Sequence, residues 1–497
     1  MQTPFFHIEI PTQAQDHKIL ANILPGADSL AVSEIVAQFN GLTVVVTNDT
    51  RSAVRLEKEL AQLSPLNVTF FPDWETLPYD SFSPHQDIIS ARLSALFHLQ
   101  QRKQGIFILP IATLMQRVCP PSYLQHRVLL INKGDRFVIE TLRLQLEKSG
   151  YRAVEQVLEH GEYAVRGALL DLFPMGSAVP FRLDFFDDEI DSIRTFDVDT
   201  QRTLQEIDQI NLLPAHEFPT DNQGIEFFRS QFRAAFGEIR RDPEHIYQQI
   251  SKGTLAAGIE YWQPLFFENM ATLFDYFPEN TLFITGEQNQ TQGERFYADA
   301  EQRFESRRVD PMRPLLSPDK LWLRIDDVNR QLKNYPAIAL KTEKVRSSAR
   351  QKNLAITPLP PLTIQSQQKE PLHQLRQFIA HFKGNILFIV ETEGRRETLL
   401  SLLAPLKLKP KQIHTLAQAT EEKLALMVSP LEHGFIIEQD VPLAIICESE
   451  LLGERVQQRQ RDKSRTVNPD TLIRNLAELQ IGQPVVHLDH GVGRYGG

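Results

Sequence analysis

The sequence predicts an α/β protein of several domains, in which a β-rich insert divides the first domain into two parts. A chain of 497 residues is too long to fold around one core, so three or four domains are expected. Apolar strand patterns alternate with helix patterns up to about Pro120 and again after the insert, which is typical of α/β domains. Between these two regions, short strands are joined by turns.

These patterns divide the chain into seven segments. In chain order they are the first part of an α/β domain (1–125), the β-rich insert (126–213), the second part of the α/β domain (214–340), a linker (341–370), a third α/β domain (371–455), a second linker (456–470) and the start of a further β-rich domain (471–497). The linkers are placed where the sequence is polar or charged and lacks apolar periodicity.

In the first part of the α/β domain, buried strands alternate with helices. Residues 42–47 (LTVVVT), 68–71 and 105–110 are short apolar runs of the kind that forms buried strands. Ser83 and Pro84 predict a helix start, with the serine as N-cap and the proline in the first turn.

The first turn from strand to helix lacks a nucleotide-binding motif. A working phosphate loop needs glycines for close backbone approach, then a lysine and a Ser or Thr that bind phosphate and Mg²⁺. Here Gly26 stands alone, Asp28 places a negative charge where phosphate would lie, and the chain contains no Gly-Lys dipeptide. We therefore predict no catalytic residue and no nucleotide cofactor in this chain.

A loop at residues 73–84 is the second place where a ligand could bind. It carries Trp74, Tyr79 and Phe82 between prolines. Exposed aromatic rings stack on nucleic-acid bases in some proteins. Packing of these rings into the core beneath the loop is the favoured interpretation.

The insert begins with a helix predicted over 139–149, and strands follow. Residues 166–173 are a short apolar run closed by turn residues, and residues 181–186 alternate between two faces. Asp187 and Asp188 predict a turn. The return strand that follows shifts its alternation by one residue, which predicts a β-bulge.

One face of the strand at 181–186 has an unusual composition. Arg182, Asp184 and Phe186 share it, because side chains two apart in a strand point the same way. An aromatic ring beside an arginine on an otherwise polar face is typical of a protein-binding anchor. The alternative is a second small core that covers this face.

After the insert and the first linker, a third α/β unit is predicted. Its helices are expected at 372–382 and 395–403, and its strands at 385–390 and 443–447. Glu448 and Glu450 follow the last strand, where a nucleotide-binding protein can carry a metal-binding acid. Without a phosphate loop, these acids instead indicate the N-terminus of a helix.

The C-terminal region offers two weak motifs. Residues 454–465 are basic and lack apolar periodicity, so we interpret them as a solvated linker; a DNA contact is the alternative. Gly491, Gly493 and Gly496 match the spacing GxGxxG, but no helix follows to receive a dinucleotide. We therefore predict no dinucleotide site.

Composition excludes several classes of protein. The 53 basic and 63 acidic residues give a net charge of −10, which argues against a chain coated by nucleic acid. Cys119 and Cys447 are far apart in the sequence and indicate a reducing compartment. The 14 histidines are scattered, and the nearest pair, His487 and His490, is poorly spaced for one metal ion. With no signal sequence or membrane-spanning run, a cytoplasmic protein without a metal site or a membrane partner is expected.

Several runs resemble a known family. The runs RGALLDLFP at 166–174 and FRLDFFDDEIDSIRTFD at 181–197 resemble the UvrA-binding domain shared by the excision-repair protein UvrB and the Mfd family of transcription-repair coupling factors. The runs DWETLPYD at 73–80 and VNPDTL at 467–472 resemble the coupling factors specifically. The resemblance extends over nearly the whole chain.

This resemblance implies a degenerate helicase-like first domain. UvrB keeps a phosphate loop in the matching domain and clamps damaged DNA with a long aromatic hairpin, and this chain has neither. The segment from Gly482 onward resembles the first strands of the RNA-polymerase-interacting domain of the coupling factors. We therefore expect a truncated chain. It would contact RNA polymerase through this truncated C-terminal domain and segments beyond Gly497, and DNA mainly through motor domains that it lacks.

The resemblance also implies a function. The chain is expected to act as an adaptor that docks UvrA at stalled transcription, and Arg166, Arg182 and Phe186 match positions used for UvrA contact. The full-length family protein uses ATP and Mg²⁺ to translocate on DNA and displace stalled RNA polymerase, whereas this chain alone is expected to have no enzymatic activity. The alternatives are a UvrB-like DNA-dependent ATPase or helicase, and a structural relic that binds no partner. The missing phosphate loop separates the adaptor from the enzyme.

Overall fold

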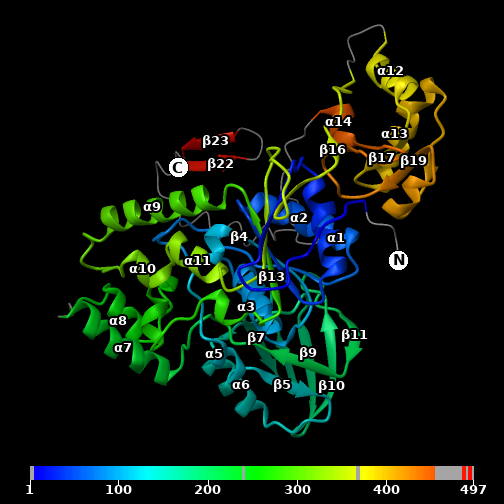
Figure 1. Cartoon of the computed structure of the whole chain (residues 1–497). Coiled ribbons are helices and arrows are strands. Elements are labelled where there is room, and N and C mark those ends of the chain that lie inside the picture. The colour runs from blue at the N-terminus through cyan, green and yellow to red at the C-terminus, as the bar shows by residue number, and fades with distance from the viewer. Residues whose placement is uncertain (1–4, 238–240, 365–369, 454–483, 488–490, 495–497) are drawn as a thin grey trace.

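The computed structural model describes residues 5–237, 241–364, 370–453, 484–487 and 491–494. Within them, the chain forms an α/β domain interrupted by a β-rich insert, followed by a further α/β domain (Figure 1). Among the described residues, no helix combines the length and the apolar character needed to cross a bilayer.

The first domain is built on a seven-stranded parallel sheet in the order β15-β1-β14-β13-β2-β4-β3. Its elements before the insert are β1 (His17–Ala21), α1 (Ala27–Gln38), β2 (Leu42–Thr47), α2 (Thr50–Leu63), β3 (Val68–Phe70), α3 (Gln86–Gln101), β4 (Gly105–Pro110), α4 (Ile111–Leu114) and α5 (Pro121–Gln125). Those after it are α7 (Asn222–Phe236), α8 (Ile246–Ser251), η1 (Ile259–Phe266), η2 (Leu273–Asp275), β13 (Thr281–Gly286), α9 (Asn289–Arg307), α10 (Pro318–Leu321), α11 (Ile325–Leu332), β14 (Ala337–Leu340) and β15 (Gln351–Asn353).

The central strands of this sheet explain the continuous apolar runs in the sequence. Every residue of β2 and of β4 is buried, because helices cover both faces of a parallel sheet. The helix predicted from Ser83 begins instead at Gln86, after the N-cap residue His85. The hydroxyl of Ser83 donates to Glu260 (2.8 Å) and accepts from the backbone N–H of Gly258 (2.9 Å). It makes these tertiary hydrogen bonds instead of capping the helix.

The insert forms an antiparallel sheet to which one short parallel strand is added. Its elements are β5 (Leu129–Asn132), α6 (Ile139–Lys148), β6 (Arg152–Ala153), β7 (Glu162–Arg166), β8 (Leu169–Leu172), β9 (Phe181–Phe186), β10 (Glu189–Phe196), β11 (Thr203–Ile207) and β12 (Gln209–Leu212). The sheet order is β11-β10-β9-β8-β7-β6, and β12 pairs separately with β5. The helix predicted at 139–149 is confirmed as α6.

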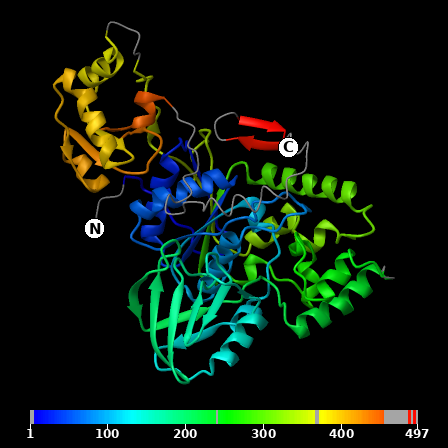
Figure 2. The same ribbon diagram turned by 180° about the vertical axis from the view of Figure 1, so that it is seen from behind.

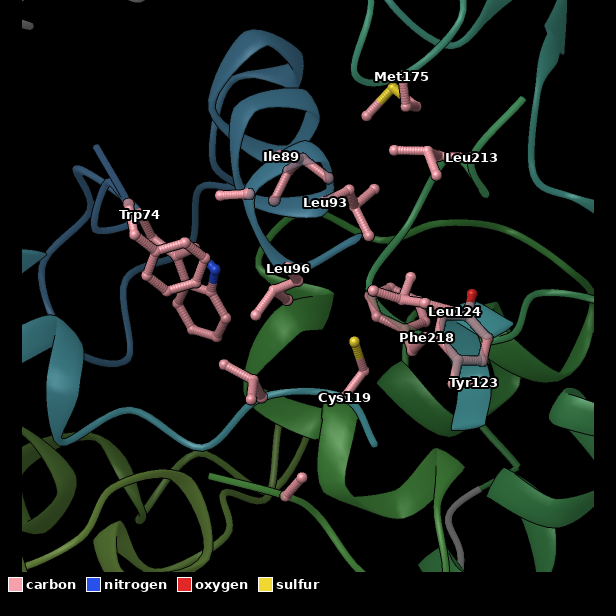
Figure 3. Packing of buried hydrophobic residues seen from close by; sticks show 14 of the residues in the cluster. Trp74, Ile89, Leu93, Leu96, Cys119, Tyr123, Leu124, Met175, Leu213 and Phe218 are labelled. Atoms are coloured by element: carbon pink, nitrogen blue, oxygen red, sulfur yellow. The ribbon is translucent and has the colours of Figure 1, made fainter. Parts of the chain in front are cut away.

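The insert and the first domain share one hydrophobic core. Figure 3 shows Met175 and Leu213, from the insert side, close to Leu93 of α3. Beside this core, buried Arg92 of α3 donates to Glu217 (Nε–Oε1 2.5 Å), just after the insert. The insert is therefore fixed to the domain that it interrupts.

The third α/β domain has a mixed six-stranded sheet in the order β16-β20-β21-β17-β19-β18. Its elements are β16 (Ile356–Thr357), α12 (His373–His381), β17 (Asn385–Val390), α13 (Glu393–Leu403), η3 (Ala404–Leu406), β18 (Lys411–Gln412), η4 (Leu416–Thr420), β19 (Leu424–Val428), β20 (Phe435–Ile437), β21 (Leu443–Cys447) and α14 (Glu448–Leu452). A last antiparallel hairpin pairs β22 (Pro484–His487) with β23 (Gly491–Arg494).

The segment predicted as a linker at 341–370 is more ordered than its polar sequence suggests. β15 adds an edge strand to the sheet of the first domain, and β16 adds an edge strand to the sheet of the third. Edge strands pair through backbone groups on one side only, so they need little apolar periodicity, which is why the sequence pattern missed them. The linker predicted at 456–470 lies outside the described residues.

Candidate protein-docking site

The insert sheet presents one face to the core and one face outward. Leu170 of β8, Leu183 of β9 and Ile193 of β10 are buried in the main core. Cross-strand pairing places these three side by side, since Leu183 lies opposite both of the others. The intervening residues of the same strands form the opposite face, which we call the outer face.

The register of the strands defines the outer face. Asp171 of β8 and Arg194 of β10 both lie opposite Arg182 of β9. Two residues further along β9, Asp184 lies between Leu169 and Ser192. Arg182, Asp184 and Phe186 therefore share the outer face, as the alternation along β9 predicts. Arg166 of β7 lies opposite Leu169, which is on the same face.

The turn and the bulge predicted after β9 are both confirmed. Asp187 adopts a left-handed conformation with φ 55°, as a tight turn between paired strands requires. The pairing of β10 with β9 shifts between Ile190 and Ser192, so one extra residue is accommodated there. The bulge keeps both Ile190 and Ile193 in the core.

Phe186 is the exposed end of this face. Its side chain is on the last residue of β9, and the residue is 75% exposed. Among the large hydrophobic residues that the structure describes as exposed, only Val309 is more so, at 78%. An exposed aromatic ring on a rigid strand has little conformational entropy to lose when a partner covers it, so it is suited to act as an anchor.

Arg182 is largely buried, whereas its position in the sequence predicts a solvated side chain. Its guanidinium donates to both carboxylate oxygens of Asp171 (Nε–Oδ1 2.7 Å, Nη2–Oδ2 2.9 Å) and to the carbonyl oxygen of Gln201 (3.3 Å). It also lies over the ring of Phe196, 5.1 Å from the ring centre. Only 18% of its side chain is exposed, so a partner can reach it only at its outer edge.

Asp171 connects the predicted arginines, and it was not singled out from the sequence. Its carboxylate is 3% exposed and also lies 3.7 Å from Nη2 of Arg166, whose side chain is 48% exposed. The hydrogen bond from Arg182 to this carboxylate raises the pKa of Arg182. A lone acid inside the apolar run 166–173 was the signal that could have identified it.

A small second core covers the other end of the outer face. Val157, Ala164, Phe173 and Phe196 form a buried cluster separate from the main core. The second small core, which was the alternative interpretation, is therefore present at this end of the face, and a docking surface stays a prediction for the rest of it. The cluster lies beside Arg182, while Phe186 and Arg166 remain accessible.

The aromatic loop at 73–84 is largely part of the core. Trp74 and Tyr79 are buried and pack against Tyr261, with ring centres 5.7 and 5.4 Å apart. The hydroxyl of Tyr79 also donates to the carbonyl oxygen of Leu316 (2.8 Å). Phe82 is the exception and is 67% exposed.

The other candidate sites of the sequence serve as structure. Glu448 and Glu450 lie in the first turn of α14, as predicted, and Glu450 accepts the backbone N–H groups of Gly434 and Cys447 (both 2.9 Å). Cys447 and Cys119 are both buried and free. In the part of the chain that the structure describes, no three His, Cys, Asp or Glu residues are grouped to hold a metal ion. The predicted false dinucleotide motif starts in strand β23, and its last glycine lies outside the described residues.

Comparison with known proteins identifies two domains of the chain. Residues 129–218 match the UvrB interaction domain family, and residues 378–451 match the family described as MFD, D3 domain. The first match contains all three candidate docking residues, Arg166, Arg182 and Phe186.

The chain also matches curated proteins over nearly its full length. A transcription-repair-coupling factor of Haemophilus influenzae is 77% identical over 497 residues, which is 100% of this chain and 43% of that protein. One of Escherichia coli is 56% identical over 99% of this chain and 43% of its own length. One of Bacillus subtilis is 24% identical over 96% of this chain and 42% of its own length. The chain therefore spans less than half the length of these relatives.

Proposed function

We propose that this chain, which is homologous over its full length to transcription-repair-coupling factors, is an adaptor that docks UvrA through the outer face of its insert. In this role it recruits nucleotide excision repair to transcription that has stalled at DNA damage. One observation carries the proposal: within the residues that match the UvrB interaction domain, Phe186 is 75% exposed on a rigid strand.

The geometry supports a division of labour among the three docking residues. Phe186 offers the apolar ring that a partner pocket would cover, and Arg166 offers a half-exposed cation on the same face of the sheet. Arg182 has most of its donors committed to Asp171 and Gln201. We therefore assign Arg182 mainly to holding the shape of the face, with its outer edge available to a carboxylate or carbonyl of UvrA.

A complete coupling factor would have two further roles, translocation on DNA and contact with RNA polymerase. The whole protein would use ATP and Mg²⁺ to translocate on DNA and displace RNA polymerase in the cytoplasm. The residues at the phosphate-loop position do not fit a nucleotide. Asp28, in the first turn of α1, places a negative charge where phosphate would lie, and it forms an ion pair with Arg55. We therefore expect no enzymatic activity from this chain by itself. Contact with polymerase would involve the region that includes the hairpin β22–β23 and further segments of the whole protein.

The main competing function is a UvrB-like, DNA-dependent ATPase. Two measurements on the purified chain separate the two functions. The adaptor predicts saturable binding of UvrA and no ATP turnover with or without DNA. DNA-stimulated ATP turnover that co-purifies with the chain would favour the enzyme, and absence of both activities would favour a structural relic.

A further inference from the structure

The loop that joins β19 to β20 in the third domain, residues 429–434, lies against the start of α1 in the first domain. Gly26 is the N-cap residue of α1 and has a φ of 83°. A Cβ atom built on Gly26 would lie 2.4 Å from the carbonyl oxygen of His433, closer than any real contact. The two backbones therefore touch at the position where a phosphate loop would hold its ligand.

A buried charge cluster lies beside this contact. Arg55 of α2 forms ion pairs with Asp28 of α1 and with Glu59 of its own helix (Nη1–Oε2 2.7 Å). Glu59 is 1% exposed, and its other oxygen accepts the backbone N–H of Glu432 from the third domain (3.3 Å). Burial raises the pKa of Glu59 to about 7, and the positive charge of Arg55 acts in the opposite direction.

Apolar contacts join the same two domains. Leu431 and Phe435 of the third domain are buried in one cluster with Ala27, Leu30 and Leu56 of the first. The side-chain amide of Gln62 on α2 also donates to the carbonyl oxygen of Val428 (2.9 Å).

The loop is held in this position from its own domain. Ser449 donates its hydroxyl to the carbonyl oxygen of Glu432. Glu450 accepts the backbone N–H of Gly434 (2.9 Å). Both residues belong to α14, so the acidic start of that helix supports the loop that reaches α1.

The contacts of the loop at 429–434 lie at the N-terminus of α1, where a phosphate loop would hold a nucleotide. The N-terminus of a helix attracts anions, because its first N–H groups are unpaired and its dipole is positive there. At α1 the carboxylate of Asp28 accepts the N–H of Ser29 (3.0 Å), and Arg55 balances its charge. The loop at 429–434 then covers the site.

We propose that the third domain acts as a built-in ligand of the degenerate nucleotide position. Its loop at 429–434 fills that position and joins the first and third domains into one cooperative unit. A nucleotide-bound domain is stabilised by its ligand, and here a covalently attached domain supplies that stabilisation permanently. Figures 1 and 2 place the third domain and the insert on different sides of the first domain, so this role is separate from docking.

Hydrogen exchange on the full chain tests this role. Leu431→Asp places a charge in the shared apolar cluster, and Val441→Asp is the matched control, because Val441 is 49% exposed in the same domain. The account predicts that Leu431→Asp speeds exchange roughly tenfold or more within α1 as well as in the third domain, while the control leaves α1 unchanged. Faster exchange confined to the third domain would overturn the proposal.

A milder variant covers the case in which Leu431→Asp does not fold. Gln62→Ala removes a single hydrogen bond across the contact, from a residue on the surface of α2. Faster exchange at 428–434 is expected, with α1 affected to a smaller extent. Unchanged exchange in both segments would contradict the contact. UvrA binding should be unaffected by either variant, so failure of this proposal and failure of the docking proposal give different results.

Discussion

Replacing Phe186 with alanine should separate docking from stability. The ring is 75% exposed in the free chain, and an aromatic side chain buries about 150–250 Å² when fully covered. Covering the exposed part, about 150 Å² at about 25 cal/mol per Å², would contribute up to about 4 kcal/mol. Alanine keeps part of that area, so we expect a loss of about 2–3 kcal/mol, which weakens UvrA binding by roughly 30- to 140-fold.

The same substitution should leave the fold almost unchanged. An exposed side chain that makes few contacts changes the free energy of unfolding by about 0.5 kcal/mol or less. A core phenylalanine would instead cost about 3–5 kcal/mol. Isothermal titration with UvrA measures the first quantity, and urea unfolding measures the second.

Phe82→Ala provides the control for this experiment. Phe82 is also an exposed phenylalanine, at 67%, but it belongs to the first domain and lies outside the matched UvrB interaction segment. It should lose neither affinity nor stability. The reasoning is refuted if folded Phe186→Ala binds UvrA as tightly as the unmodified chain, or if Phe82→Ala loses as much affinity as Phe186→Ala.

Three further predictions concern Arg182 and Arg166 of the outer face, and His216. Arg182→Glu should lower the free energy of unfolding by about 3–5 kcal/mol, because buried Asp171 would lose its partner and gain a like charge; unfolding by urea at an unchanged midpoint would disprove the pairing. Arg166→Ala should weaken UvrA binding by about 1–2 kcal/mol with little change in the urea midpoint, since its side chain is half-exposed and Arg182 still neutralises Asp171; equal affinity would remove Arg166 from the site. Burial lowers the pKa of His216 from 6.5 to about 4. As the pH falls from 7 to 4, His216 therefore becomes protonated in the unfolded chain while it stays neutral in the folded chain. Stability should therefore fall over that range by up to about 3 kcal/mol, and His216→Gln should flatten this part of a plot of stability against pH.

Local patterns in the sequence were sufficient to predict β9, the turn and bulge that follow it and the return strand β10, but not β5, β6, β11 or β12. The alternation of residues 181–186 placed Phe186 on the outer face, and the shift after Asp188 announced the bulge at 190–192. Both features depend on side-chain period alone, which the sequence of one strand contains. The buried strands β2 and β4 were identified instead from their continuous apolar runs, which are typical of strands covered on both faces.

Contacts between distant segments were beyond the sequence. The pairing of Asp171 with Arg182 depends on the register of two strands, and the low exposure of Arg182 depends on its contacts with Gln201 and Phe196. The contact between Gly26 of the first domain and His433 of the third joins residues about 400 positions apart. No pattern in either segment of the sequence indicates that the two are in contact. These are the places where the structure changed the interpretation of the candidate site.

The central claim is that this chain docks UvrA through a surface of the same kind that UvrB uses. A competition titration tests it most directly: the chain carries a fluorescent label on an introduced cysteine far from the insert, UvrA is added to saturation, and unlabelled UvrB is then titrated in. The account predicts saturable binding of UvrA and complete displacement of the chain by UvrB, because both would cover the same site. Failure of UvrA to bind, or simultaneous binding of UvrB and the chain without displacement, would contradict it.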